Sequence, residues 1–190
     1  MSENVKHDSE PPKIEKSPFP ISEASVKKTL ESIAENPTKR YRESSLDIQS
    51  NNPGVAILIR ELVDIRSNNG SDPMDVISGC IWAYELIKDS VEGKGGHMPI
   101  LVEEELAAYS QNRKGEKMGK SASDFITRRM EEIRKVEPAF IKAIEDIYKY
   151  SIRPDFSYLG ATEIYIAVKQ ADSNSNFTTM MEGMGVDLKG

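Results

Sequence analysis

Apolar residues recur three or four positions apart through most of residues 21–171, and this spacing constrains the fold more than any other feature of the chain. A period near 3.6 places such side chains on one face of an α-helix. The repeats begin at pairs such as Asn52-Pro53 and Asp72-Pro73, where a capping residue precedes proline at the first helical position. The pattern predicts an all-α fold, a single helical bundle-like domain of about six or seven helices.

The sequence also indicates where these helices begin and end. The first is expected after the N-cap Ser22, where Ile21 and Val26 have the spacing of a hydrophobic staple, and it should end at Asn36-Pro37. Residues 38–52 are polar and are expected to form an irregular connector. Further helices are expected to begin at Pro53, Pro73, Pro99, Ser121 and Pro138.

Three segments carry more specific expectations. Residues 55–65 are so rich in apolar side chains that most of the circumference of this helix should be covered, and it should pair as an antiparallel hairpin with the helix that begins at Pro73. The helix expected at Pro99 should turn Val102 and Leu106 inward, together with Tyr109. Residues 160–170 are ambiguous, because their β-branched side chains also suit a strand. We expect a helix there, since no partner strand is apparent elsewhere.

The two ends of the chain differ from the body in composition. Residues 1–20 contain four prolines and few apolar anchors, so we expect an extended, mobile arm. Residues 172–190 are expected to form a flexible tail with a short apolar motif at positions i, i+3, i+4 and i+7: Phe177, Met180, Met181 and Met184. As one or two turns of helix this stripe would fit a partner's groove, although two glycines nearby oppose a helix in isolation. The alternatives are fraying and packing on the chain's own domain.

Composition excludes several kinds of site. The net charge of −6 gives no general attraction to nucleic acid, so any basic site must be local. A single cysteine, Cys80, permits no disulfide framework, and the two histidines permit no histidine-rich metal site. No apolar run reaches the length needed to span a membrane, and residues 1–13 do not resemble a secretory signal. We therefore expect a soluble intracellular, cytoplasmic protein with no bound metal.

The fragment GEKMGKS, residues 115–121, looks like a phosphate-binding loop but has the wrong spacing. A P-loop needs four residues between its first glycine and the Gly-Lys pair, and here three residues separate Gly115 from Gly119. Residues 117–121 resemble more closely the flexible signature loop of class I aminoacyl-tRNA synthetases, in which lysines stabilise the charge of ATP phosphates. That resemblance implies nucleotide chemistry on a parallel sheet, and the helical pattern of this chain predicts no such sheet. We therefore expect no catalytic residue and no cofactor.

Two clusters of basic residues are candidate sites for phosphate or nucleic acid. The first precedes an expected helix start, where free amides and the helix dipole favour an anion: Arg113, Lys114, Lys117, Lys120 and Ser121. The second surrounds Tyr41, a mixture of cationic and aromatic groups that single-stranded nucleic acid can use: Lys39, Arg40 and Arg42. For both clusters the alternative is an ordinary solvated, charged segment.

These features favour an assembly protein over an enzyme. A helical body with two terminal arms is typical of subunits that dock on their neighbours, and the basic clusters could contact RNA phosphates as in a nucleocapsid or coat protein. A second hypothesis is a small regulatory adaptor that binds a protein partner through its C-terminal motif. A third is a nucleotide-binding enzyme that uses residues 115–121.

Overall fold

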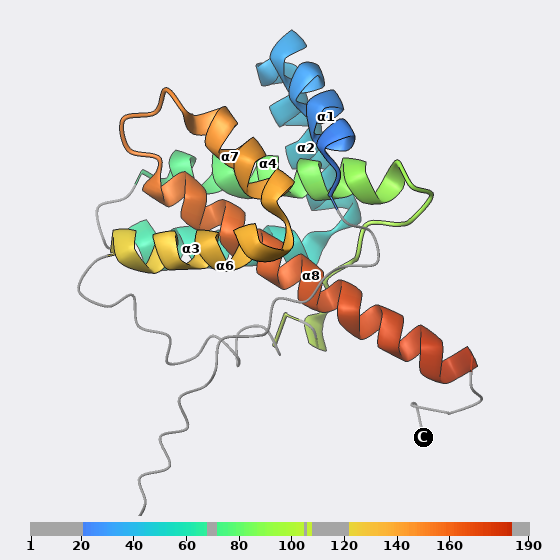
Figure 1. Cartoon of the computed structure of the whole chain (residues 1–190). Coiled ribbons are helices and arrows are strands. Elements are labelled where there is room, and N and C mark those ends of the chain that lie inside the picture. Colours follow the sequence, from blue (N-terminus) through green and yellow to red (C-terminus); the bar gives the residue numbers. More distant parts are fainter. Residues whose placement is uncertain (1–20, 68–71, 105, 108–121, 184–190) are drawn as a thin grey trace, which may run out of the picture.

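The computed structural model describes residues 21–67, 72–104, 106–107 and 122–183, with the backbone alone at 65–67, 122, 170 and 172–183 (Figure 1). These residues form α-helices and connecting segments, and no strand occurs among them. The all-α expectation is therefore confirmed. Residues 160–170, which the sequence left ambiguous between helix and strand, are helical.

The first two helices differ in how well the sequence predicted them. Helix α1, Glu23–Glu35, begins as expected, because the Ser22 side chain accepts a hydrogen bond from the backbone N–H of Ser25 at 3.1 Å. Asn36 ends α1 and also caps the next helix, since its side chain accepts from the N–H of Lys39. Helix α2, Pro37–Asn51, occupies the segment expected to be an irregular connector, so that prediction was wrong.

Interactions with α4, Pro73–Glu92, explain why the polar α2 segment is a helix. Lys88 of α4 donates to Asp47 at 2.9 Å, and Arg40 reaches two carboxylates of the same helix. Ile48 is buried and belongs to the hydrophobic core. Helical propensity alone would leave such a polar segment marginal, and the stability comes from these contacts with α4.

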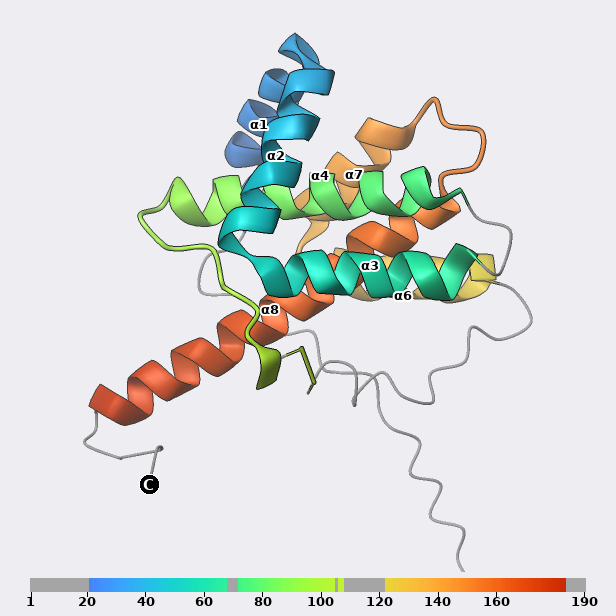
Figure 2. The same cartoon turned by 180° about the vertical axis from the view of Figure 1, so that it is seen from behind.

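Helix α3, Pro53–Ser67, runs antiparallel to α4 as expected (Figure 2). Asp72 caps α4 by accepting from the N–H of Met74 at 2.9 Å. However, α3 is not covered on most of its circumference. Ile57 is 43% exposed and Arg60 is exposed, so α3 is an amphipathic outer helix and the expectation of a core helix was wrong.

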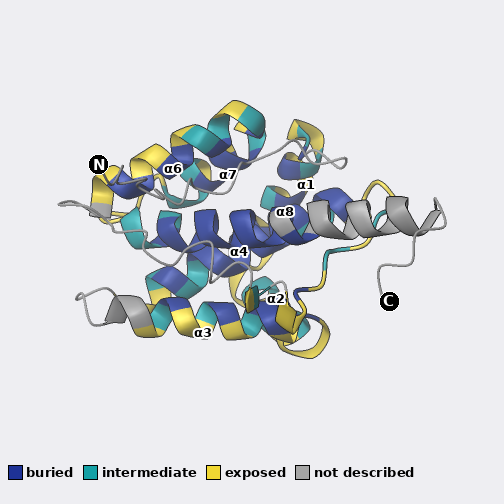
Figure 3. Ribbon diagram, turned by 90° about the horizontal axis from the view of Figure 1, so that it is seen from below, coloured by how far each residue is buried: buried dark blue, intermediate teal, exposed yellow. Residues whose placement is uncertain are grey.

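The centre of the domain is formed by α4 and α8, Asp155–Gly183. Residues 159–169 of α8 are buried without interruption, and Figure 3 shows both helices dark blue over most of their packed length. Two glycines allow the helices to cross closely. A Cβ atom at Gly79 of α4 would lie 1.9 Å from the carbonyl oxygen of Ser157, and one at Gly160 of α8 would lie 2.3 Å from that of Val76.

The segment after α4 does not start a helix at Pro99. Residues 96–102 are irregular, and helical backbone resumes at residue 103. Asn52 holds the irregular segment against the start of α3: its amide donates to the Pro99 carbonyl at 2.9 Å and its oxygen accepts from the N–H of Leu101 at 3.0 Å. Consequently Leu101 is buried and Val102 is exposed, the reverse of the expected inward position of Val102, while Tyr109 lies outside the described residues.

Helices α6, Ala122–Val136, and α7, Pro138–Tyr148, complete the body around Glu137. The Glu137 carboxylate lies 3.1 Å from the Lys169 ammonium and accepts from Tyr165 Oη at 3.1 Å. It also accepts from the backbone N–H of Ile21 at 2.8 Å. The side chains of Glu137 and Lys169 are only 2% and 7% exposed, so this is a buried ion pair. It ties the junction of α6 and α7 to α8 and to Ile21, two residues before α1.

Candidate functional site

The basic residues predicted around Tyr41 lie on α2 and do not act as one cluster. Lys39 is largely exposed and pairs with Glu43 one turn away at 3.9 Å, and Arg42 is exposed. Arg40 instead turns toward α4. Its guanidinium donates to Glu85 at 2.7 Å and to Asp89 at 3.0 Å, and a third donor bonds Ser32 of α1. Lys39 and Arg42 are therefore exposed to solvent, whereas the Arg40 guanidinium is bound within the protein.

The ion pairs change the protonation chemistry of Arg40. Burial alone would lower its pKa, but the hydrogen bond and charge of Glu85, with those of Asp89, outweigh burial and raise the pKa above its ordinary value. The guanidinium stays charged, which the nearly buried Glu85 carboxylate requires.

We expect Arg40→Gln to lower the free energy of unfolding by about 2 kcal/mol, because it leaves the Glu85 carboxylate without its cationic partner. Urea denaturation followed by circular dichroism measures this change. Arg42→Gln is the matched control on the same helix and should shift stability by less than about 0.5 kcal/mol. Equal, small effects of both substitutions would show that Arg40 has no structural role.

The other predicted sites are described only in part. Residues Arg113, Lys114, Lys117, Lys120 and Ser121 lie outside the described residues, as does Met184. Phe177, Met180 and Met181 lie on the continuous helical backbone of α8, which runs past the boundary expected at residue 171 and ends at Gly183. Figures 1 and 2 show this last part of α8 projecting away from the other helices.

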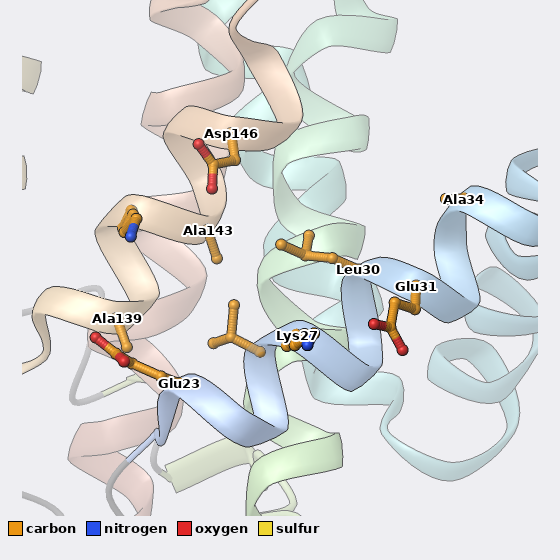
Figure 4. A pocket seen from close by; sticks show the side chains of 10 residues that line it. Glu23, Lys27, Leu30, Glu31, Ala34, Ala139, Ala143 and Asp146 are labelled. Atoms are coloured by element: carbon orange, nitrogen blue, oxygen red, sulfur yellow. The ribbon is translucent and has the colours of Figure 1, made fainter.

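An apolar groove lies between α1 and α7, with a volume of about 410 Å³. The two helices start close together, near Glu23 and Ala139, and Ala143 of α7 faces Leu30 of α1 (Figure 4). The groove exists because α7 presents alanines four residues apart, which are too small to fill the space beside α1. We call this the α1/α7 groove; its lining is Glu23, Val26, Lys27, Leu30, Glu31, Ala34, Ala139, Lys142, Ala143 and Asp146.

The α1/α7 groove combines an apolar floor with a charged rim. Valine, leucine and alanine side chains form the floor, and the charged side chains of Glu23, Glu31 and Asp146 on the rim are opposed by Lys27 and Lys142. Three acidic groups against two basic ones leave the rim slightly negative. Such a groove suits an apolar segment with some positive charge, and it holds no arrangement of nucleophile and base.

A second groove, of about 650 Å³, is bounded by α2, α3 and α4. Its apolar lining comes from all three helices and includes the exposed Ile57, and Arg60 is its charged residue. We call this the α2/α3/α4 groove; its lining is Ser45, Ile48, Gln49, Pro53, Ala56, Ile57, Ile59, Arg60, Val63, Ile77 and Ile81. A methionine or aromatic stripe with a nearby carboxylate would match this surface.

Neither groove was predicted from the sequence. Val26 and Leu30 are four residues apart and share a face of α1, but nothing in the sequence pairs that helix with α7. The spacing of Ala139 and Ala143 is the one local signal, since two small residues on one helix face leave room for something else. The α2/α3/α4 groove depends on α2, which was expected to be irregular.

Metal clusters and membrane-spanning helices are both absent from the part of the chain that the structure describes. No cluster of three metal-binding side chains occurs within the described ranges. No helix in this part of the chain combines the length and apolar character needed to cross a membrane. No known protein family, curated protein or solved structure matches the chain.

Proposed function

We propose that the protein is a non-enzymatic assembly subunit in which the end of α8 of one copy docks in the α2/α3/α4 groove of another copy. The observation that carries this proposal is the projection of α8 beyond its own body, with Phe177, Met180 and Met181 on the projecting part. A helix that leads away from its own domain can bury an apolar stripe only against a second molecule.

The chemistry of the groove supports this occupant. Full burial of a phenylalanine or methionine side chain is worth roughly 1.5 to 3 kcal/mol, so three such residues can offset much of the entropy lost on association. Methionine also adapts to an irregular apolar surface. Ile57, which is 43% exposed in the monomer, would become covered at the edge of the groove.

Charge supports the same pairing. The α2/α3/α4 groove carries Arg60, and the segment around the stripe contains Asp172, Glu182 and Asp187 against a single lysine, Lys189. The α1/α7 groove has a slightly negative rim and is a poorer match for this acidic segment. The contact joins two different surfaces, the end of α8 and the groove. Two copies can therefore form a dimer by exchanging their α8 ends, or many copies can form a ring or a filament.

We expect deletion of residues 173–190 to convert the assembly to a monomer, measured by light scattering after size-exclusion chromatography at about 100 μM. Ile57→Asp should have the same effect, because it places a charge in the groove. Leu46→Asp is the matched control, since Leu46 is 57% exposed on α2 but does not line the groove. A full-length protein that is monomeric at this concentration would contradict the proposal.

A charge exchange tests the pairing itself. Arg60→Glu and Glu182→Arg should each weaken self-association, and an equimolar mixture of the two variants should recover part of it through the complementary contact. If the mixture is no more associated than either variant alone, Arg60 and Glu182 do not meet. A protein partner that binds only the wild-type tail, with no self-association, would favour the adaptor hypothesis.

Contact with RNA is a separate part of the proposal. Lys39 and Arg42 are the members of the α2 cluster that remain exposed, and each phosphate they neutralise would release counterions. Affinity for a single-stranded RNA should then fall steeply between about 50 and 200 mM salt and drop further in a Lys39→Gln, Arg42→Gln double variant. Binding that does not depend on salt would count against a nucleocapsid-like role.

A further inference from the structure

Residues 1–20, the predicted N-terminal arm, lie outside the described residues and directly precede Ile21, which lies at the mouth of the α1/α7 groove. Ile21 is buried, and its backbone N–H donates to the Glu137 carboxylate at 2.8 Å. Glu137 immediately precedes α7, and Ala139 of the groove lies two residues further on. Glu23, at the other side of the mouth, lies two residues after Ile21. The hydrogen bond therefore fixes the point from which the arm departs.

The distances allow the arm to reach along the groove. A helix rises by about 1.5 Å per residue, so Ala139 to Asp146 covers roughly 10 Å. An extended chain covers about 3.3 Å per residue, so three or four residues of arm are enough to follow it. Phe19, only two residues before Ile21, can lie no further than about 7 Å along the chain from that fixed point. It is the first large apolar side chain that the groove could receive.

The composition of the arm matches the groove. Pro18-Phe19-Pro20 supplies one aromatic ring between two residues of fixed φ, which lowers the entropy lost when the segment docks. Lys13 and Lys16 precede it, and the groove rim carries the carboxylates of Glu31 and Asp146 at its far end. An aromatic ring above alanines, with lysines near carboxylates, is a complementary contact.

We propose that residues 13–20 fold back and occupy the α1/α7 groove of their own chain, with Phe19 packed against Val26 and Ala139. This contact uses a different groove and a different segment from the assembly proposed above, so either can fail without the other. The arm then covers an apolar surface that would otherwise be open, and any external ligand of that groove must displace it.

A pair of engineered cysteines tests where the arm lies. Cys80 does not compete, because burial raises the pKa of its thiol and keeps it protonated and inaccessible. The test variant combines Ser17→Cys with Lys142→Cys, a position that lines the groove. The matched control variant combines Ser17→Cys with Lys28→Cys, an exposed position on α1 that does not line it. Both variants are oxidised as the full chain and separated on a non-reducing gel.

We expect the test variant to form an intramolecular disulfide at least about tenfold faster than the control variant, at a rate independent of protein concentration. Adding Phe19→Ser should reduce the rate to that of the control, because the ring holds the arm in place. Equal rates for the two variants, or no effect of Phe19→Ser, would overturn the proposal. A disulfide that forms only between chains would also overturn it, since the occupant would then be the arm of another copy.

Discussion

We expect Glu137→Ala to lower the free energy of unfolding by about 3 to 5 kcal/mol, far more than a substitution at the protein surface. The change removes the anionic partner of Lys169, whose side chain is 7% exposed, and leaves a cation in the core. It also removes the acceptor for the N–H of Ile21 and for the hydroxyl of Tyr165. The Lys169 ammonium makes no hydrogen bond of good geometry with the described atoms, so its 3.1 Å ion pair with Glu137 is its main compensation.

A double variant separates the charge from the hydrogen bonds. Glu137→Gln keeps an acceptor oxygen, and Lys169→Met removes the buried charge while preserving the apolar stem. The two together should recover most of the lost stability, because a neutral pair avoids the cost of burying charge. Lys39→Met removes an exposed pair and should cost less than about 0.5 kcal/mol. Urea denaturation measures each variant; a Glu137→Ala protein within about 1 kcal/mol of wild type would show that the pair is not buried.

Glu137→Ala should also affect the pKa of Tyr165, because Glu137 contributes to the raised pKa of that phenol. Burial raises the pKa of its phenol, and the charge of Glu137 together with their hydrogen bond raises it further. The phenol therefore stays protonated at neutral pH and donates to the carboxylate. It contributes to the cluster as a donor and cannot act as a base.

We expect Gly160→Ala to destabilise the protein by about 3 kcal/mol, although alanine is the better helix former. Helix propensity alone predicts a gain in stability of about 1 kcal/mol. The sign of the measured change therefore shows whether propensity or the steric contact of the added Cβ dominates. A Cβ at Gly160 would lie 2.3 Å from the carbonyl oxygen of Val76 and 3.0 Å from Sγ of Cys80. The first contact is with backbone, which can be relieved only by moving α4 and α8 apart.

Thermal and urea unfolding of Gly160→Ala provide the measurement. Thr127→Ala, at an exposed position of α6, is the control for a substitution that adds helix propensity without a close contact, and it should shift stability by less than about 0.5 kcal/mol. Gly79→Ala should resemble Gly160→Ala, because its Cβ would lie 1.9 Å from the carbonyl oxygen of Ser157. An increase in stability for either glycine variant would contradict the close crossing of α4 and α8.

The sequence predicted the helices whose starts carry a chemical signal. Ser22 and Asp72 cap α1 and α4 as expected because a side-chain acceptor close to an unpaired N–H is a local requirement. Helix α2 was missed although Asn36 and Pro37 give its start the same kind of signal, because the segment that follows is polar and lacks a clear apolar stripe. Its stability comes from Arg40 and Asp47, which meet partners on α4 more than forty residues away, and local pattern contains no trace of such pairs.

The local sequence pattern also could not predict which helix lies at the centre of the domain. Residues 55–65 are rich in apolar side chains, yet α3 lies on the outside. Residues 159–169 of α8 include Glu163 and Lys169, which are typical of a surface, yet every one of these residues is buried. The difference in burial between α3 and α8 depends on how many other helices surround each of them. The grooves escaped prediction for the same reason, because each exists only where helices distant in the sequence come together.

The central position of α8 has a consequence for synthesis. As the chain leaves the ribosome, α4 appears before α6, α7 and α8, yet α8 supplies most of the surface on which α4 packs. Until α8 has emerged, the face of α4 that packs against it lacks its main partner and exposes apolar surface, although α1, α2 and α3 can already contact other parts of α4. The nascent chain is then a natural client for chaperones, and truncation before Asp155 should yield an insoluble product rather than a smaller folded protein.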